Sequence, residues 1–428
     1  MKRFLPVRVQ GLLLNQTRKR LLQNFVSLSV LQGLNYLLPL LVMPVLMQAL
    51  GVATFGLLSY AQAFIQYFII VIDYGFDLSG TQQIARHREE PEKLKEIVTH
   101  ILALKLLFFV SSFLVLLGLV TWVPVFQENR LLFLVSFGVA LGQLLMPIWF
   151  FQGMERMKYV TIVHLISKAI YAGLIFLVVR QPQDILWVPI LQASGIVVAG
   201  GVSLTLLWRE FGMRPTGVTL SGLKYQLGQG WFVFISNVSI SAYTISNTFF
   251  LGLLAGPVAA GYYSGAEKIV RAVQGLFIPV SQTLFPYLSK LMHESPERMI
   301  GLLRTLARWT FLGAALVSFI IAVAAPWLVK LVMGEEFLPV VPVLRILAGL
   351  PLLVCLSNVF GIQAMLNLGY RRQFFYILFT GSVLNIAAVP FVAEHFKYTG
   401  VALLLMITEG LVTGLMYFFL YKRGVKLL

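Results

Sequence analysis

Residues 230–290 decide the fold, and they read GWFVFISNVSISAYTISNTFFLGLLAGPVAAGYYSGAEKIVRAVQGLFIPVSQTLFPYLSK. The stretch predicts two membrane-spanning helices joined by a short neutral turn, because a span needs about 20 mostly apolar residues. The second helix carries Glu267, Lys268 and Arg271. Charged side chains within spans face a bundle interior or a water-filled cavity. Two interpretations stay open: Glu267 and Arg271 pair at i and i+4 to hold the helix, or the charges form a net-positive cavity wall.

The composition extends the membrane interpretation to the whole chain. Of 428 residues, 58% are apolar and only 12% are charged, whereas soluble domains carry about a quarter charged residues. We therefore expect an all-α polytopic membrane protein with about 12 transmembrane helices. The predicted spans are 25–50, 55–74, 97–122, 131–151, 159–179, 185–208, 231–254, 261–289, 306–333, 340–368, 373–393 and 399–420.

The basic residues give the orientation of these spans. The N-terminal segment and the loops on its side of the membrane carry 24 lysines and arginines, whereas the opposite loops carry 4. Such an excess marks the cytoplasmic side, so both termini are expected in the cytoplasm. The single cysteine, Cys355, excludes disulfides within the chain, and the five histidines show no metal-ligand spacing. No metal or other cofactor is expected.

An internal repeat divides the chain. Four positions match four others at a constant offset of 205 residues: Gly51, Gly56, Ser59 and Ala61 correspond to Gly256, Gly261, Ser264 and Ala266. The offset predicts two six-helix lobes in the same orientation around a central cavity, the parallel-repeat plan of some transporters. The expected lobes are residues 1–215, with the basic N-terminus, and residues 216–428. The charged helix would then face the repeat partner that carries Gln62 and Gln66.

Several segments carry a resemblance to a known family: 32–39, 55–56, 73–76, 241–248 and 261–268. They resemble Wzx-type polysaccharide flippases, the polysaccharide transporters of the multidrug/oligosaccharidyl-lipid/polysaccharide superfamily. The resemblance implies a multi-pass protein of the bacterial inner membrane. It also implies that undecaprenyl-pyrophosphate-linked oligosaccharides, for O-antigen or related lipopolysaccharide and surface polymers, move from the cytoplasmic to the periplasmic leaflet. The cavity would be lined largely by the first, second, seventh and eighth spans.

Candidate site residues follow from this chemistry. Lys268, Arg271 and Lys168 are the candidates for binding pyrophosphate, because cationic donors make charge-assisted hydrogen bonds to phosphate oxygens. Lys168 shares one helix face with His164 and Tyr171. The alternative for Lys168 is snorkelling to the interface. The candidates for a polar, sugar-facing wall are Gln32, Asn35, Gln62, Gln66, Asn237, Ser241, Tyr243, Thr244, Asn247 and Ser264. The alternative for the polar wall is helix–helix packing.

Three carboxylates are candidates for ion coupling or charge pairing: Glu267, Glu409 and Asp73. Glu409 lies about nine residues inside the last span without a cation nearby in sequence, which suits either proton coupling or a neutral structural role. Asp73 ends the second span or pairs with a nearby arginine. Lys105, in the third span, either faces the cavity or snorkels to the interface, and snorkelling is favoured.

Two other functions compete with the flippase. One is a drug or cation antiporter of the same superfamily, which a cavity rich in carboxylates would favour. The other is a membrane-embedded polysaccharide polymerase or glycosyltransferase, which would need large outer loops or a catalytic domain. No nucleophile–base pair is found, so no catalytic residues are expected. The expected partners are a lipid-linked oligosaccharide, membrane lipid, a coupling proton or sodium ion, and the polymerase and chain-length regulator of the pathway. Nucleic acid is not expected.

The distribution of basic residues makes a topology prediction. Cysteines introduced near Gly256 should be labelled from the periplasm, and those near Met213 only after the membrane is opened. Labelling of both sites from the cytoplasmic side would contradict the lobe assignment.

Overall fold

The computed structural model describes residues 7–275 and 277–427, without the side chains of residues 7–37, 39, 40, 242, 278, 279, 282, 283, 286, 290 and 293. Every regular element in this part of the chain is a helix. The first half contains α1 (Val7–Asp73), α2 (Phe76–Arg86), α3 (Pro91–Trp122), α4 (Pro124–Gln127), α5 (Arg130–Ser136), α6 (Gly138–Leu145), α7 (Ile148–Gly153), α8 (Met157–Val178), η1 (Pro182–Leu186) and α9 (Trp187–Arg209).

The second half of the chain continues the helical pattern. It contains α10 (Leu220–Thr244), α11 (Ser246–Phe250), η2 (Leu251–Ala255), α12 (Pro257–Gly275), α13 (Ile278–Glu294), α14 (Pro296–Val332), η3 (Glu335–Val340), α15 (Val341–Leu347), α16 (Leu350–Ser357), η4 (Asn358–Leu366) and α17 (Arg371–Lys422). The all-α prediction is confirmed within the described residues.

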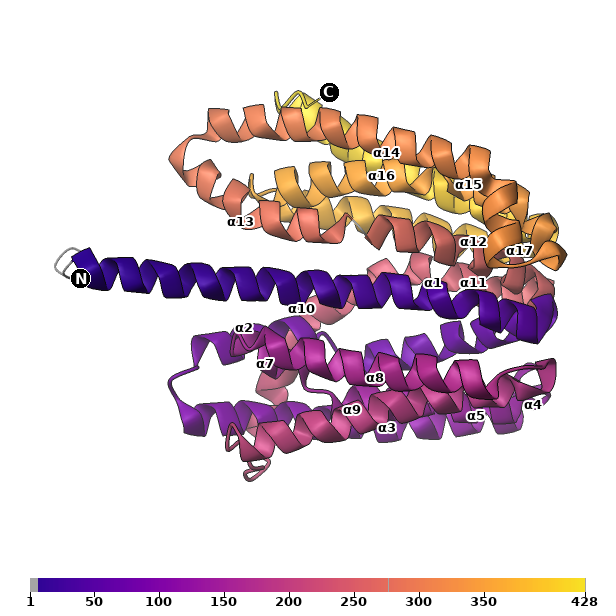
Figure 1. Ribbon diagram of the computed structural model, residues 1–428, viewed down its shortest axis with the longest axis horizontal. Coiled ribbons are helices and arrows are strands. Elements are labelled where there is room, and N and C mark those ends of the chain that lie inside the picture. The colour runs from indigo at the N-terminus through magenta and orange to yellow at the C-terminus, as the bar shows by residue number, and fades with distance from the viewer. Residues whose placement is uncertain (1–6, 276, 428) are drawn as a thin grey trace.

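Two of the long helices reverse direction at a single residue. Gly51 interrupts α1 with φ 69° and ψ 173°, and Lys397 interrupts α17 with φ 51° and ψ −148°. In Figure 1, α1 runs from the N-terminus across the molecule and returns towards α2. The spans predicted on either side of Gly51, 25–50 and 55–74, are therefore the two arms of α1.

Apolar length confirms a membrane protein. Eight helices in the described ranges are long and apolar enough to cross a membrane, or nine if Leu220–Ser241 and Ser246–Ala255, bent by 49°, form one span. Because α1 reverses at Gly51 and α17 at Lys397, two helices in this count each contain residues of two arms. The total of twelve spans stays a prediction.

The helices form two groups. Figure 1 shows α2 to α9 gathered on one side of α1, and α12 to α17 gathered on the other. Helix α10 joins both groups. Its Gln226 exchanges hydrogen bonds of 2.7 and 3.0 Å with Gln83 of α2, whereas the carbonyl of Ser239 accepts a 2.7 Å bond from Ser382 of α17. The two lobes predicted at 1–215 and 216–428 remain a proposal, with α10 in contact with both.

The two copies of the sequence repeat touch each other. A Cβ atom added at Gly56 would lie 1.8 Å from the Pro257 carbonyl oxygen, and one added at Gly261 would lie 2.6 Å from the Val52 carbonyl oxygen. The repeat-related Gly51 and Gly256 also share one backbone conformation, with φ of 69° and 86° and ψ of 173° and 171°. Only glycine adopts this conformation at little cost. The matching glycines thus mark a crossing of α1 and α12 at backbone contact.

A buried ion pair corrects the expectation for Lys105. Its side chain does not snorkel: it is 1% exposed, and its Nζ lies 2.8 Å from Asp73 Oδ1 and donates to the Gln143 carbonyl at 3.3 Å. The open question about Asp73 is answered in the same way, since its partner is a lysine of α3 and not an arginine. The Asp73 carboxylate compensates the Lys105 charge inside the bundle, so the side chain does not need to extend to the membrane interface.

The α1–α12 crossing can be tested with alanine. Gly56→Ala and Gly261→Ala should each lower the thermal stability of the purified protein, because overpacking costs about 1–3 kcal/mol and backbone atoms cannot move aside as side chains do. Gly173→Ala is the matched control, since nothing lies within 4 Å of a Cβ there. In a helix this control change should leave the stability equal or slightly higher. Equal melting temperatures for all three variants would contradict the contact.

Candidate functional site

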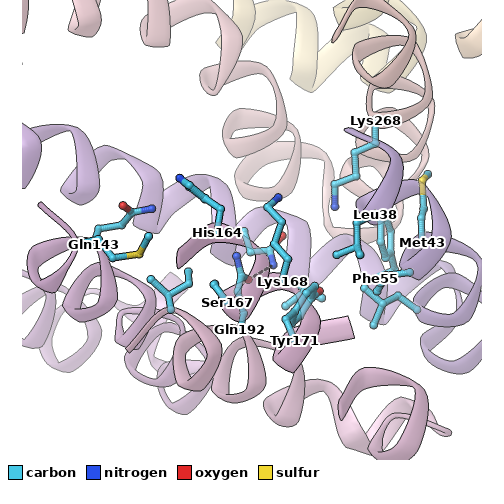
Figure 2. Close-up of a pocket in the computed structure, with 16 residues that line it drawn as sticks. Leu38, Met43, Phe55, Gln143, His164, Ser167, Lys168, Tyr171, Gln192 and Lys268 are labelled. Atoms are coloured by element: carbon cyan, nitrogen blue, oxygen red, sulfur yellow. Dashed lines mark hydrogen bonds between the residues drawn. The ribbon is translucent and has the colours of Figure 1, made fainter. Parts of the chain in front are cut away.

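A cavity of about 400 Å³ lies between α1, α6, α8, α9 and α12 (Figure 2). Both arms of α1 supply mostly apolar residues to its lining. The polar lining residues are Gln62 of α1 and, from the other helices, Gln143, His164, Ser167, Lys168, Tyr171, Gln192 and Lys268. No aspartate or glutamate occurs among the described residues that line it. Ligand cavities typically range from about 300 to 1,000 Å³, so a small charged group and a neighbouring sugar fit.

Helix periodicity explains the polar face of α8. His164, Lys168 and Tyr171 follow at i, i+4 and i+7, so they lie on one face as the sequence predicts, and all three line the cavity. Gln62 of α1 donates a 3.2 Å hydrogen bond to the side-chain oxygen of Gln192 on α9. Lys168 does not form a salt bridge with any described carboxylate.

Lys268 reaches the same cavity from α12. Figure 2 shows the Lys168 and Lys268 side chains pointing towards a common space from opposite walls. The Lys268 Nζ lies 4.7 Å from the centroid of the Phe55 ring. The structure therefore brings together two of the three cations predicted to bind pyrophosphate. Two ammonium groups that face one space attract an anion.

Arg271 has different surroundings. Its Nη2 and Nε lie 2.7 and 3.0 Å from Glu267 Oε1, and Nη2 also donates to the Thr244 carbonyl at 3.4 Å. Arg271 is not among the residues that line the cavity. Both sequence interpretations of α12 thus describe part of it: Glu267 and Arg271 pair along the helix, while Lys268 faces the cavity.

Glu409 belongs with that pair. It is 8% exposed and interacts electrostatically with Arg271 and with Tyr243. Arg271 is thus ion-paired with Glu267 and within electrostatic range of Glu409; we call Glu267, Arg271 and Glu409 the carboxylate cluster. The sequence did not reveal this neighbourhood, because Arg271 and Glu409 are 138 residues apart.

Most residues predicted for the polar wall lie elsewhere. Of that set, Gln62 lines the cavity. Asn247 is fully buried and donates a 3.1 Å hydrogen bond to the Tyr263 hydroxyl. Ser264 and Thr244 bond to carbonyls of their own helices, at 3.4 and 3.1 Å. Among the others, Tyr243 is buried, Ser241 is half-buried, Gln66 and Asn237 are exposed, and the side chains of Gln32 and Asn35 lie outside the described residues. Helix–helix packing, the alternative, thus accounts for Asn247, whose bond joins α11 to α12.

Several cavity residues were missed by the sequence reasoning, among them Phe55, Gln143, Ser167 and Gln192. Gln192 interrupts the apolar span 185–208, and a polar side chain in such a span is a usable signal. Phe55 gives no such signal in the sequence, because phenylalanine is common in membrane helices.

Comparisons with known proteins agree on one family. The model of the family described as "Polysaccharide biosynthesis protein" matches residues 21–292. A protein of Escherichia coli (strain K12) named "Putative O-antigen transporter" is 33% identical over 97% of this chain and 100% of its own length. A Shigella dysenteriae protein of the same name is 27% identical over 91% and 97%.

Solved structures show the same fold at low identity. An inward-facing multidrug resistance MATE family transporter of the MOP superfamily matches with TM-score 0.73 and 15% identity, over 94% of this chain and 98% of its own. The lipid II flippase MurJ, in its inward closed conformation, matches with TM-score 0.77 and 13% identity, over 92% and 87%.

The pairing of Glu267 with Arg271 makes a stability prediction. Arg271→Gln should lower the stability by about 1–3 kcal/mol, between the values for exposed and buried pairs, because it leaves Glu267 without its cation. Glu267→Gln combined with Arg271→Gln should restore most of that loss. Lys268→Gln, the neighbouring cation outside the pair, is the control, and thermal unfolding in detergent measures all of them. A double variant as unstable as Arg271→Gln would contradict the pairing.

Proposed function

The chain belongs to the polysaccharide biosynthesis protein family, and from this premise we propose that it is a flippase for undecaprenyl-pyrophosphate-linked oligosaccharides. The substrate would be a repeat unit of O-antigen or a related surface polysaccharide. Movement would run from the cytoplasmic to the periplasmic leaflet of the bacterial inner membrane, with both chain termini in the cytoplasm. The relatives named as O-antigen transporters and the likeness to a lipid II flippase support this class of substrate.

One observation carries the proposal: Lys168 and Lys268 face a common cavity from opposite walls. A diphosphate bears charge on several oxygens, and ammonium groups bind phosphate oxygens through charge-assisted hydrogen bonds. The amides of Gln62, Gln143 and Gln192 supply the donors and acceptors that sugar hydroxyls need. The polyprenyl chain is apolar and can remain in the bilayer.

The charge of the cavity also favours the flippase over a drug or cation antiporter. The MATE transporter shares the fold, so a drug or cation antiporter is the second candidate. A cation would face two lysines without a carboxylate among the described lining residues, and like charges repel. The cavity thus favours an anionic substrate.

We place ion coupling in the carboxylate cluster. With Glu267 paired to Arg271, Glu409 adds a second buried carboxylate to a single guanidinium. A buried negative charge without its own partner is costly, so a proton or a monovalent cation at Glu409 would balance the cluster. Glu409→Gln would then reduce transport without reducing membrane abundance.

The lysine pair is tested by transport. In proteoliposomes with a lipid-linked oligosaccharide, Lys168→Ala and Lys268→Ala should each lower the apparent affinity about 10- to 100-fold, the value of a hydrogen bond to a charged group. Arginine at either position should recover part of the affinity. Lys158→Ala is the control, since Lys158 begins the same helix as Lys168 but lies over Tyr159, outside the cavity.

Membrane abundance and unfolding temperature are measured in parallel with transport. Transport by the Lys168→Ala, Lys268→Ala double variant at the level of Lys158→Ala would refute the phosphate site.

A further inference from the structure

Lys268 is a cavity cation whose neighbour is a ring instead of a carboxylate. Its Nζ lies 4.7 Å from the Phe55 centroid. Glu267, the adjacent acid on α12, is turned to Arg271 at 2.7 Å. Among the described residues no salt bridge to Lys268 is found. The face of an aromatic ring carries a negative quadrupole that attracts a cation within about 6 Å.

The Phe55 ring is held firmly in place. It is 1% exposed and meets Phe337 edge to face, with centroids 6.4 Å apart and an interplanar angle of 80°. The next residue, Gly56, lies at the backbone contact between α1 and α12. Because the crossing fixes Gly56, it also fixes where the adjacent ring meets α12.

The internal repeat does not duplicate the pair of Phe55 and Lys268. At the offset of 205, the position related to Phe55 is Ala260, and the position related to Lys268 is Ala63. Neither alanine can form a cation–π contact. The glycines of the α1–α12 crossing occur in both copies of the repeat. The Phe55 ring and the Lys268 ammonium each occur in one copy, on opposite sides of the crossing.

We propose that Phe55 is a positioning residue that holds the Lys268 ammonium over its ring and directs its N–H donors to an anionic phosphate group in the cavity. The proposal rests on the proposed function. A carboxylate partner would compete with phosphate for the ammonium. A ring attracts the cation through its face, and the ammonium N–H donors that point away from the ring stay available to the ligand. A desolvated pair of this kind corresponds to about tenfold or more in affinity.

Fluorinated phenylalanines test the ring separately from its shape. Each added fluorine withdraws charge from the ring face and changes its size little. Full-length protein in nanodiscs would carry phenylalanine with one, two or three ring fluorines at position 55, and calorimetry would measure binding of inorganic pyrophosphate. The Kd should rise stepwise with fluorination, by about tenfold over the series. A packing role alone would leave the Kd constant over the series, because the fluorines change the size of the ring little.

Phe64 provides the matched control. It lies on the same arm of α1, is 7% exposed, and stacks on Phe126 at 4.7 Å, without a described cation over its ring. Fluorination there should leave the Kd unchanged. Phe55→Leu, which removes the ring, should weaken binding at least as much as the most fluorinated variant.

The two proposals fail in different ways. If Lys268→Ala weakens pyrophosphate binding but the fluorinated series at position 55 has a constant Kd, the role of Phe55 is refuted and the phosphate site stands. If Lys268→Ala leaves pyrophosphate binding unchanged, the phosphate site is refuted, and the role of Phe55 with it.

Discussion

Helices α1 and α12 cross at Gly56 and Gly261, and this crossing sets the distance between the two groups of helices. A Cβ at Gly56 would lie 1.8 Å from a carbonyl oxygen of the facing helix, so the two backbones touch without side chains between them. Small residues allow this approach in membranes, where packing and not the hydrophobic effect holds helices together. The crossing joins the two groups of helices and brings Lys268 of α12 to the cavity lined by α1 and α8.

The chain handles its buried charges in three ways. Lys105 is paired with Asp73 at 2.8 Å, and this pair ties α3 to the end of α1. Arg271 forms an ion pair with Glu267 and interacts electrostatically with Glu409. Lys168 and Lys268 face open space instead. Buried charges are costly unless they are compensated. The two lysines therefore favour an anion from outside the protein, and this is why we propose the cavity as the substrate site.

Sequence reasoning reached the fold more completely than the site. Composition and apolar length predicted a helical membrane protein, and the glycine repeat identified positions that meet at the crossing. Lys168 and Lys268 were both named as phosphate ligands, and both line the cavity. Arg271 was named with them but lies on Glu267. Asn247 and Ser264 are held by bonds to Tyr263 and to the backbone of α12.

These differences have one physical reason. Hydropathy, glycine spacing and the i, i+4 relation are local or periodic properties, so the sequence alone predicts the helices, their membrane environment and the helix faces that carry charge. Which face meets which depends on crossings between segments far apart in the chain. Only the tertiary structure could therefore place Phe55 beneath Lys268, Lys105 on Asp73, and Glu409 within electrostatic range of Arg271.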